Sequence, residues 1–139
     1  VIGDKIYLIG GDDGKPVSKI ETFDLITQEW QTEGDLFYGL EKPAIAFHEN
    51  TIYIYEDRLM YTYDIKTKQL KEYETDLALK YSAMYFNNNK LYILGGRKDN
   101  KYEKLPSSAV FNIEIKEFKN TKPTRTKILQ KEINMAKVN

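Results

Sequence analysis

An internal repeat is the feature that most constrains how this chain folds. The segment Lys5–Gly11 (KIYLIGG) returns as Lys90–Gly96 (KLYILGG), and a degenerate copy, Thr51–Asp57 (TIYIYED), lies between them. The copies start at positions 5, 51 and 90, so successive starts are 46 and 39 residues apart. A period of about 20 to 50 residues is typical of repeat architectures, in which each repeat is one supersecondary unit that packs on its neighbours.

Each copy is followed by a second common element, in which an aromatic residue precedes a large apolar residue by seven positions. The three pairs are Phe23 and Trp30, Tyr63 and Leu70, and Phe111 and Phe118. Between the members of each pair lies a polar segment that begins with Asp or Asn, at residues 24–29, 64–69 and 112–117. An Asx side chain at the start of a turn can accept hydrogen bonds from backbone amides, so each segment predicts a hairpin turn.

The apolar runs indicate β-strands, because they are four to six residues long, rich in Ile, Tyr, Phe and Val, and bounded by turn residues. The second repeat predicts four antiparallel strands, at residues 43–48, 51–55, 59–64 and 69–74. The third repeat is expected from about residue 80 to residue 119, and the first has no opening strand, because residues 1–4 are interpreted as its end and turn. Four short strands per repeat are typical of a propeller blade, so we predict an all-β fold of about three blades.

The predicted organisation is a run of repeats over residues 1–119, divided at about 1–35, 36–76 and 77–119, and a basic segment over residues 120–139. Residues 119–139 hold six Lys or Arg and one Glu, a charge of +5, which leaves 15 bases and 20 acids, or −5, for residues 1–118. The basic segment is expected either as a strand that completes the blade opened at Val1 or as a tail. Propellers have about four to eight blades, so three predict either a fragment of a larger propeller or a homodimer that completes a six-bladed ring.

Composition excludes several classes of site. The 139 residues include no Cys and one His, so thiolate zinc sites, iron–sulfur clusters, cysteine nucleophiles and His-rich metal centres are absent. We therefore expect no cofactor, no metal and no catalytic residue, and a structural role for His48, which ends a strand beside Glu49. The longest apolar stretches have five or six residues, against about 20 in a membrane helix, and no leader is present in this sequence, so we expect a soluble chain whose compartment stays open.

The ordered pattern resembles the kelch repeat, which is marked by a glycine doublet after a strand and, later, by an aromatic residue and a tryptophan. The first repeat matches with Gly10, Gly11, Phe23 and Trp30. The third keeps Gly95, Gly96 and Phe111 but has Phe118 in place of Trp, and the second keeps Tyr63 but has Glu56 and Asp57 for the glycines and Leu70 for Trp. We interpret these residues as structural: the glycines turn the backbone out of a strand, and Trp30, Leu70 and Phe118 pack in the core or between blades.

Loops are the expected binding regions, because propellers place ligands on the loops at the mouths of the central channel. The loops after the glycine doublets are the longest and most polar. They and the shortened loop of the second repeat provide the candidate binding residues Asp12, Asp13, Arg58, Arg97 and Tyr102. Two further aromatic residues, Phe37 and Tyr38, are interpreted first as core packing and second as partner anchors.

The resemblance implies one of two functions. Most kelch-like propellers are scaffolds that bind another protein through their loops, and some are enzymes, including copper oxidases and sialic-acid mutarotases. The copper site needs a cross-linked Cys, which this sequence does not contain. We therefore expect a non-catalytic protein-binding module, with a carbohydrate-binding or sugar-epimerase propeller as the alternative. The −5 charge of residues 1–118 gives no electrostatic reason to bind nucleic acid. The Cys-free, Lys- and Asn-rich composition resembles that of bacterial propeller modules.

Overall fold

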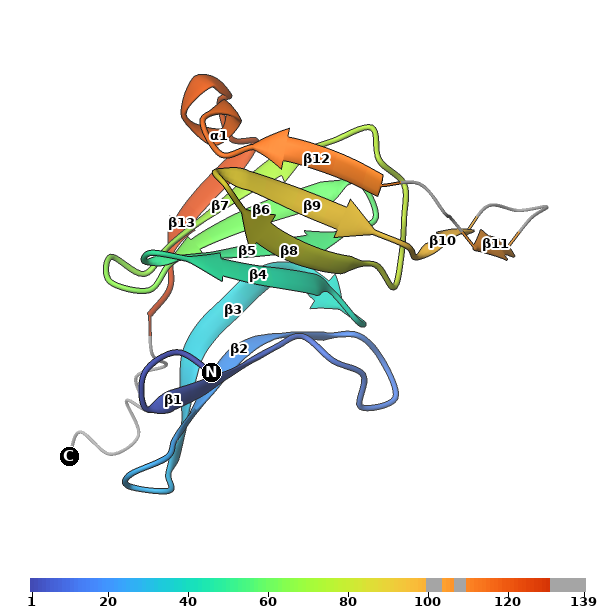
Figure 1. Ribbon diagram of the computed structural model, residues 1–139. Helices are drawn as coiled ribbons and strands as arrows, with labels where there is room; N and C mark the ends of the chain where they lie inside the picture. Colours follow the sequence, from blue (N-terminus) through green and yellow to red (C-terminus); the bar gives the residue numbers. More distant parts are fainter. Residues whose placement is uncertain (100–103, 107–109, 131–139) are drawn as a thin grey trace. The chain divides into compact units, whose positions relative to one another are not determined.

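The computed structural model describes residues 1–99, 104–106 and 110–130, and these residues form mainly β-strands (Figure 1). All of the strand pairs are antiparallel within several small sheets, which confirms the predicted all-β, blade-like fold. The chain divides into two compact units. Unit 1 comprises residues 1–41 together with Leu129 and Gln130, and unit 2 comprises residues 42–128.

Unit 1 contains one three-stranded sheet, in the order β1 (Lys5–Ile9), β2 (Val17–Asp24) and β3 (Trp30–Leu40). Among the described residues, β1 lies at the edge of this sheet. Gly34 of β3 has a φ of 152°, and a Cβ atom added there would lie 2.9 Å from the Cβ atom of Leu129. Leu129 is buried, so it packs directly on the β3 backbone.

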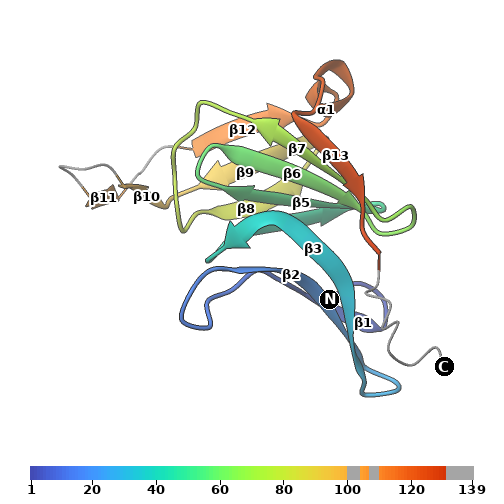
Figure 2. The same ribbon diagram turned by 180° about the vertical axis from the view of Figure 1, so that it is seen from behind.

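Unit 2 contains the complete sheet of the middle repeat. Its four strands follow one another in sequence and in space, at the predicted positions: β4 (Ala44–His48), β5 (Thr51–Glu56), β6 (Leu59–Asp64) and β7 (Gln69–Glu74). A fifth strand, β13 (Arg125–Ile128), pairs antiparallel with the free edge of β7 (Figure 2).

Buried Glu72 attaches β13 to β7. The Thr124 amide donates to the Glu72 carbonyl oxygen at 2.8 Å, and the Thr124 hydroxyl donates to Oε1 at 2.8 Å. Arg125 donates from Nε to Oε1 at 3.2 Å and from Nη2 to Oε2 at 3.0 Å. A buried carboxylate is costly unless it is paired, so these bonds fix the segment on the middle sheet. Residues 125–128 of the basic segment therefore form a strand on the middle sheet rather than on the sheet that opens at Val1.

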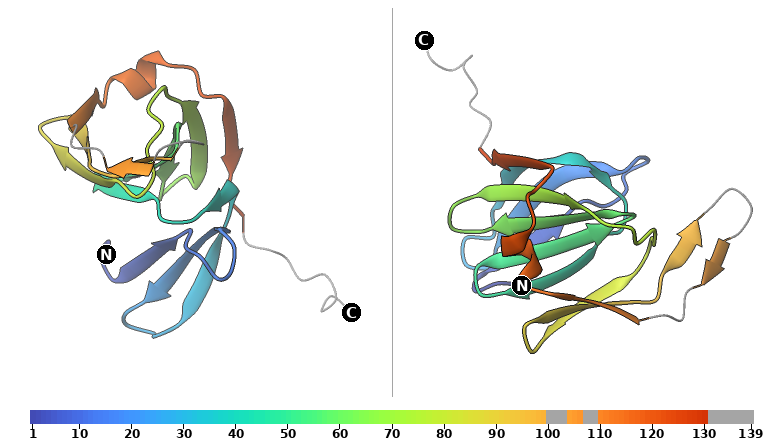
Figure 3. Two further views of the ribbon diagram at one scale, coloured as in Figure 1. Left: turned by 90° about the vertical axis from the view of Figure 1, so that its right-hand side faces the viewer. Right: turned by 90° about the horizontal axis from the view of Figure 1, so that it is seen from above.

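The third repeat also lies in unit 2 and forms a three-stranded sheet in the order β12 (Val110–Glu114), β9 (Lys90–Leu94) and β8 (Ala83–Asn87). A short hairpin, β10 (Arg97–Asp99) and β11 (Lys104–Pro106), extends away from it (Figure 3). After β12 the chain forms the single-turn helix α1 (Glu117–Asn120). The hairpin turn predicted at residues 112–117 is therefore not followed directly by a strand, because Phe118 lies in this helix.

The core of unit 2 lies between the middle and third sheets. The middle sheet contributes Ala44, Ala46, Tyr53, Tyr55, Met60 and Tyr73, and the third sheet contributes Met84, Leu91 and Ile93. Phe118 of α1 packs against this cluster, with its ring centroid 5.3 Å from that of Tyr53 and 5.2 Å from that of Tyr73. Such aromatic pairs contribute about 0.5–1.5 kcal/mol each beyond the area that they bury. Phe118 is thus a packing residue, as predicted, although in a helix.

Two of the three predicted Asx turns are present. The Asp24 carboxylate accepts hydrogen bonds from the amides of Ile26 and Thr27, at 2.8 and 3.0 Å. Asp64 forms the same pair of bonds in the second repeat, at 2.8 and 2.9 Å. In both turns the bond from the threonine amide is the main reason that the pKa of the aspartate is lowered. The third turn does not form at Asn112, because this residue lies inside β12.

Strand register explains why the third turn is misplaced. The residues Ile6, Ile52 and Leu91 occupy the same position in the three copies of the repeat, and their strand partners are Phe23, Tyr63 and Ile113. Phe111 instead pairs with Ile93, two residues away. A shift of two residues keeps a side chain on the same face of a strand, so the apolar pattern does not reveal it. The prediction that Phe111 is the counterpart of Phe23 and Tyr63 is therefore wrong, and Ile113 has that place.

The first sheet exposes a face that the middle sheet buries. Ile6, Leu8 and Trp30 are 37%, 50% and 58% exposed, whereas their counterparts Ile52, Ile54 and Leu70 are 1%, 0% and 0% exposed. Trp30 does contact Phe23, with ring centroids 5.0 Å apart. Trp30 is thus not buried within this chain, and of the two expected packing roles, core and inter-blade, the exposed position is compatible with the second.

The contrast between Leu8 and Ile54 predicts unequal effects of the same truncation. We expect Ile54→Ala to lower the free energy of unfolding by about 2–5 kcal/mol, because it leaves a cavity in a packed core. In the monomeric chain, Leu8→Ala should cost under about 1 kcal/mol, since half of this side chain is already in water. Urea denaturation of both variants checks this. Equal losses would contradict it and would indicate that another surface covers Leu8 in solution.

Candidate functional site

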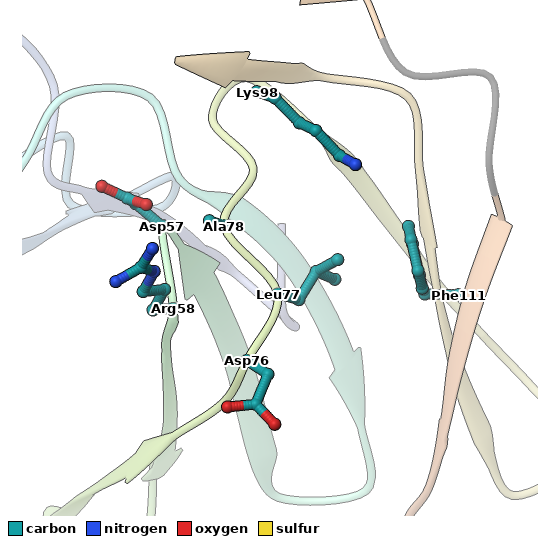
Figure 4. A pocket seen from close by; sticks show the side chains of 7 residues that line it. All are labelled: Asp57, Arg58, Asp76, Leu77, Ala78, Lys98 and Phe111. Carbon is teal, nitrogen blue, oxygen red and sulfur yellow. The ribbon is translucent and has the colours of Figure 1, made fainter. Parts of the chain in front are cut away.

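The candidate site is an open hollow of about 670 Å³ in unit 2, at the end of the middle sheet where β5, β6 and β7 meet their loops. We call it the Arg58 hollow; the residues that line it are Asp57, Arg58, Asp76, Leu77, Ala78, Lys98 and Phe111. In Figure 4 the side chains of Leu77, Lys98 and Phe111, which come from three different elements, point toward the same space. The hollow therefore combines two large apolar side chains with two acids and two bases.

Arg58 is held in place by its backbone. It lies with Asp57 in the tight turn between β5 and β6, where φ is 43° for Asp57 and 72° for Arg58, as in the two-residue turns that suit the twist of a hairpin. The Asp57 amide donates to the Leu79 carbonyl and the Arg58 amide to the Leu77 carbonyl, both at 2.9 Å. The Thr75 amide donates to the Arg58 carbonyl at 2.7 Å. The turn and the connection from β7 to β8 thus form one hydrogen-bonded unit.

Tyr55 supports this unit from the core. Its hydroxyl donates to the Leu77 carbonyl and accepts a hydrogen bond from the Leu79 amide at 3.1 Å. Burial of the side chain raises the pKa of Tyr55, so the hydroxyl keeps its proton and continues to donate at neutral pH. Leu77 is therefore presented to the hollow by a connection that is anchored on a buried phenol.

The middle repeat keeps a backbone hydrogen bond of the glycine doublet without its glycines. In the first repeat the Gly11 amide donates to the Leu40 carbonyl at 2.8 Å, and a Cβ atom on Gly10 would lie 2.5 Å from that oxygen. Counted from the start of each repeat, Asp57 corresponds to Gly11, and its bond to Leu79 corresponds to the bond to Leu40. Asp adopts positive φ more readily than most residues, which explains how it replaces the glycine.

Of the four predicted loop residues that the structure describes, Arg58 is the one that lines this hollow. Arg58 lines the hollow, whereas Arg97 is exposed in β10, where its backbone bridges to Lys80, and the neighbouring Lys98 lines the hollow instead. Asp12 and Asp13 belong to unit 1, and the Asp12 carboxylate accepts a hydrogen bond from the Gly14 amide at 2.8 Å, as in an Asx turn. Tyr102 lies outside the described residues.

Sequence reasoning found one of the seven lining residues, Arg58, and missed the other six, namely Asp57, Asp76, Leu77, Ala78, Lys98 and Phe111. Asp76 and Leu77 lie in the connection between two repeats, which showed no motif. Lys98 lies next to Arg97, which is one of the predicted binding residues. Phe111 was interpreted as a structural residue. The available signal was the pattern of residues 76–79. Asp76 is followed by leucines at two alternate positions, Leu77 and Leu79, and leucines at such positions indicate a connection that packs against the protein rather than one that lies in solvent.

The structure also places the remaining candidates. The His48 ring stacks on the Phe86 ring, with centroids 3.8 Å apart, which supports the structural role expected for it. Phe37 and Tyr38 lie within β3 rather than in a loop, and Tyr38 is exposed. Across residues 1–99, 104–106 and 110–130, no group of three or more His, Asp or Glu side chains is placed to hold a metal ion. In the same part of the chain, no helix has the length and apolar character needed to cross a bilayer.

Comparison with known families identifies the first repeat. A family model described as the Kelch motif matches residues 1–36, which contain the doublet Gly10–Gly11 and the pair Phe23 and Trp30. The first repeat is a kelch motif. The predicted kelch-repeat family is thereby confirmed through residues 1–36. A comparison with curated proteins finds no match.

The positive φ of Asp57 leads to a prediction about the stability of the chain. We expect Asp57→Gly to leave the free energy of unfolding unchanged or to raise it, because glycine adopts this backbone conformation without steric cost. Asp57→Ala should lower it by about 1 kcal/mol, since alanine is strained there and keeps the same amide. Urea denaturation of the two variants measures the difference. If glycine and alanine cost the same, the Asp57 carboxylate rather than the backbone stabilises the turn.

Proposed function

We propose that this kelch-repeat chain is a non-catalytic protein-binding module and that a partner docks on the Arg58 hollow. The observation that carries the proposal is the combination of apolar and charged side chains on a backbone that is fixed before binding. Leu77 and Phe111 offer apolar contact, and Arg58, Lys98, Asp57 and Asp76 offer both signs of charge. Protein interfaces are typically formed by such a mixture, with aromatic and Arg side chains enriched among the residues that contribute most.

The fixed backbone supports binding in a second way. The hydrogen bonds from Asp57 and Arg58 to Leu79 and Leu77 hold the loops in one arrangement, so less conformational entropy is lost when a partner binds. Asp57, Arg58, Asp76 and Lys98 are all exposed, which suits contact with a large partner. Acid–base catalysis on a sugar, the alternative function, usually relies on carboxyl groups whose burial adjusts their pKa.

A variant that removes two charges tests the proposed site. The site variant is Arg58→Asn with Lys98→Gln, in which Asn is chosen because it tolerates positive φ. The matched control, Lys15→Gln with Lys66→Gln, removes the same charge at two exposed lysines that do not line the hollow. Each immobilised chain is used to capture proteins, which are then quantified by mass spectrometry. We expect the control to capture at least one protein in the same amount as the unaltered chain does. The site variant should capture about tenfold less of that protein.

Two outcomes would overturn this proposal. The first is a set of captured proteins that the site variant retains in full. The second is N-acetylneuraminate binding, measured by calorimetry, that the site variant abolishes while no captured protein depends on the site. The second result would assign the hollow to the alternative, a carbohydrate-binding propeller.

A second copy of the chain is the other proposed partner. The exposed apolar face formed by Ile6, Leu8 and Trp30 supports this, because the counterparts of these residues in the middle sheet are buried. Two chains of three repeats would supply the sheets of a six-bladed ring. Light scattering should then give a mass of about twice 16.3 kDa, and Leu8→Lys should give 16.3 kDa. The control is Ile26→Lys, at a residue that is 74% exposed in a turn of the same unit. A monomer at every concentration would contradict the homodimer.

A further inference from the structure

A second hollow, of about 630 Å³, lies in unit 2 between the face of the middle sheet and the segment that connects β12 to β13. We call it the Lys71 hollow. Tyr53 pairs with Thr62 and Thr62 pairs with Lys71 across three adjacent strands, so these side chains point to one face. On the opposite side, Lys119 and Lys122 belong to the connecting segment and line the same space.

The charge of this hollow has one sign. Three lysines, Lys71, Lys119 and Lys122, line it, and no Asp or Glu is among the described residues that do so. Lys119 and Lys122 are exposed, and Lys71 is half-buried in the sheet face. The Arg58 hollow, in contrast, carries acids and bases in equal number. Three cations around one concave space attract an anion more strongly than the same cations spread over a convex surface.

The floor of the hollow is neutral and well fixed. Burial is the main cause that raises the pKa of both Tyr53 and Tyr73, so their phenols stay protonated and add no negative charge. The Tyr73 hydroxyl donates to the Phe118 carbonyl at 3.4 Å, and the Phe118 ring packs on both tyrosine rings. These contacts hold the connecting segment, and with it Lys119, against the sheet that carries Lys71.

We propose that the Lys71 hollow binds an acidic peptide segment, one that is rich in Asp and Glu. Carboxylates suit lysine ammonium groups, which act as point charges and need no bidentate geometry. Single-stranded nucleic acid fits less well, because its bases stack on exposed aromatic rings and the tyrosines of this floor are each only 5% exposed. The volume also exceeds what one small anion fills and is in the range of sites for short ligands.

Fluorescence anisotropy with a labelled hexaglutamate peptide tests this site on the full chain at low salt. The site variant is Lys71→Gln with Lys119→Gln and Lys122→Gln. Its control is Lys15→Gln with Lys19→Gln and Lys66→Gln, which removes three exposed lysines that do not line the hollow and gives the same net charge. We expect the site variant to bind about tenfold more weakly and the control to change the dissociation constant less than twofold, with circular dichroism showing that both are folded.

Three results would overturn the proposal: no binding of hexaglutamate, equal weakening by both triple variants, or tighter binding of a labelled oligothymidylate that is lost only in the site variant. Equal weakening would mean attraction by net charge alone, and preference for the oligonucleotide would mean a different class of ligand. The Arg58 hollow does not enter this assay. The variant with Arg58→Asn and Lys98→Gln should bind hexaglutamate less than twofold more weakly, so a failure here is distinct from a failure of the proposed function.

Discussion

The apolar contact between the middle and third sheets is the interaction on which both candidate sites depend. Both faces of a blade-like sheet carry large apolar side chains, so such a sheet is stable only when another sheet covers it. In unit 2 the tyrosines of β5 and β7 meet Leu91 and Ile93 of β9 in one cluster. The Arg58 hollow opens at the loop ends of these two sheets, and the Lys71 hollow lies where Phe118 closes over the same tyrosines.

Backbone hydrogen bonds at the bases of the loops hold the loops in defined positions on the packed sheets. In both of the first two repeats, an amide with positive φ donates to the carbonyl of a buried leucine just before the next repeat. Gly11 and Leu40 form this bond in one repeat, and Asp57 and Leu79 form it in the other. The bond joins the turn after the second strand of a repeat to the connection that leaves its last strand. Residues of that turn and that connection are therefore neighbours in space, which is why Arg58 meets Leu77.

Sequence patterns predicted those parts of the fold that depend on local alternation and turn residues. The four strands of the middle repeat could be placed to within a residue or two, because each is a short apolar run bounded by turn residues. The sequence did not determine which residue of β12 pairs with Leu91. Phe111 and Ile113 lie on the same face of the strand, so an alternation with a period of two fits either residue. The partner of β13 was not predictable either, because it depends on a buried Glu72 that looks like a surface residue in the sequence.

The candidate site was predictable only where a motif marked it. Arg58 was found because it follows the degenerate doublet, but Asp76 and Lys98 reach the same hollow from segments that no motif marks. Their proximity arises from tertiary packing: the connection that carries Asp76 is tied to the Arg58 turn, and β10 is bridged to Lys80 of that same connection. A site built from three loops is encoded in these backbone contacts rather than in any one stretch of residues.

The degenerate second repeat shows that kelch residues and burial are separate properties. The first repeat has the complete motif, yet its Trp30 is 58% exposed, whereas the second has Leu70 at that position and buries it fully. The difference in exposure is therefore not set by the identity of the side chain, because Trp30 is larger than Leu70 and would bury more area if a neighbouring surface were available. It is set by whether a second apolar surface covers that face. The motif fixes the turn and the strand pairing within one repeat, and the stability of each repeat depends on the surface that packs against it.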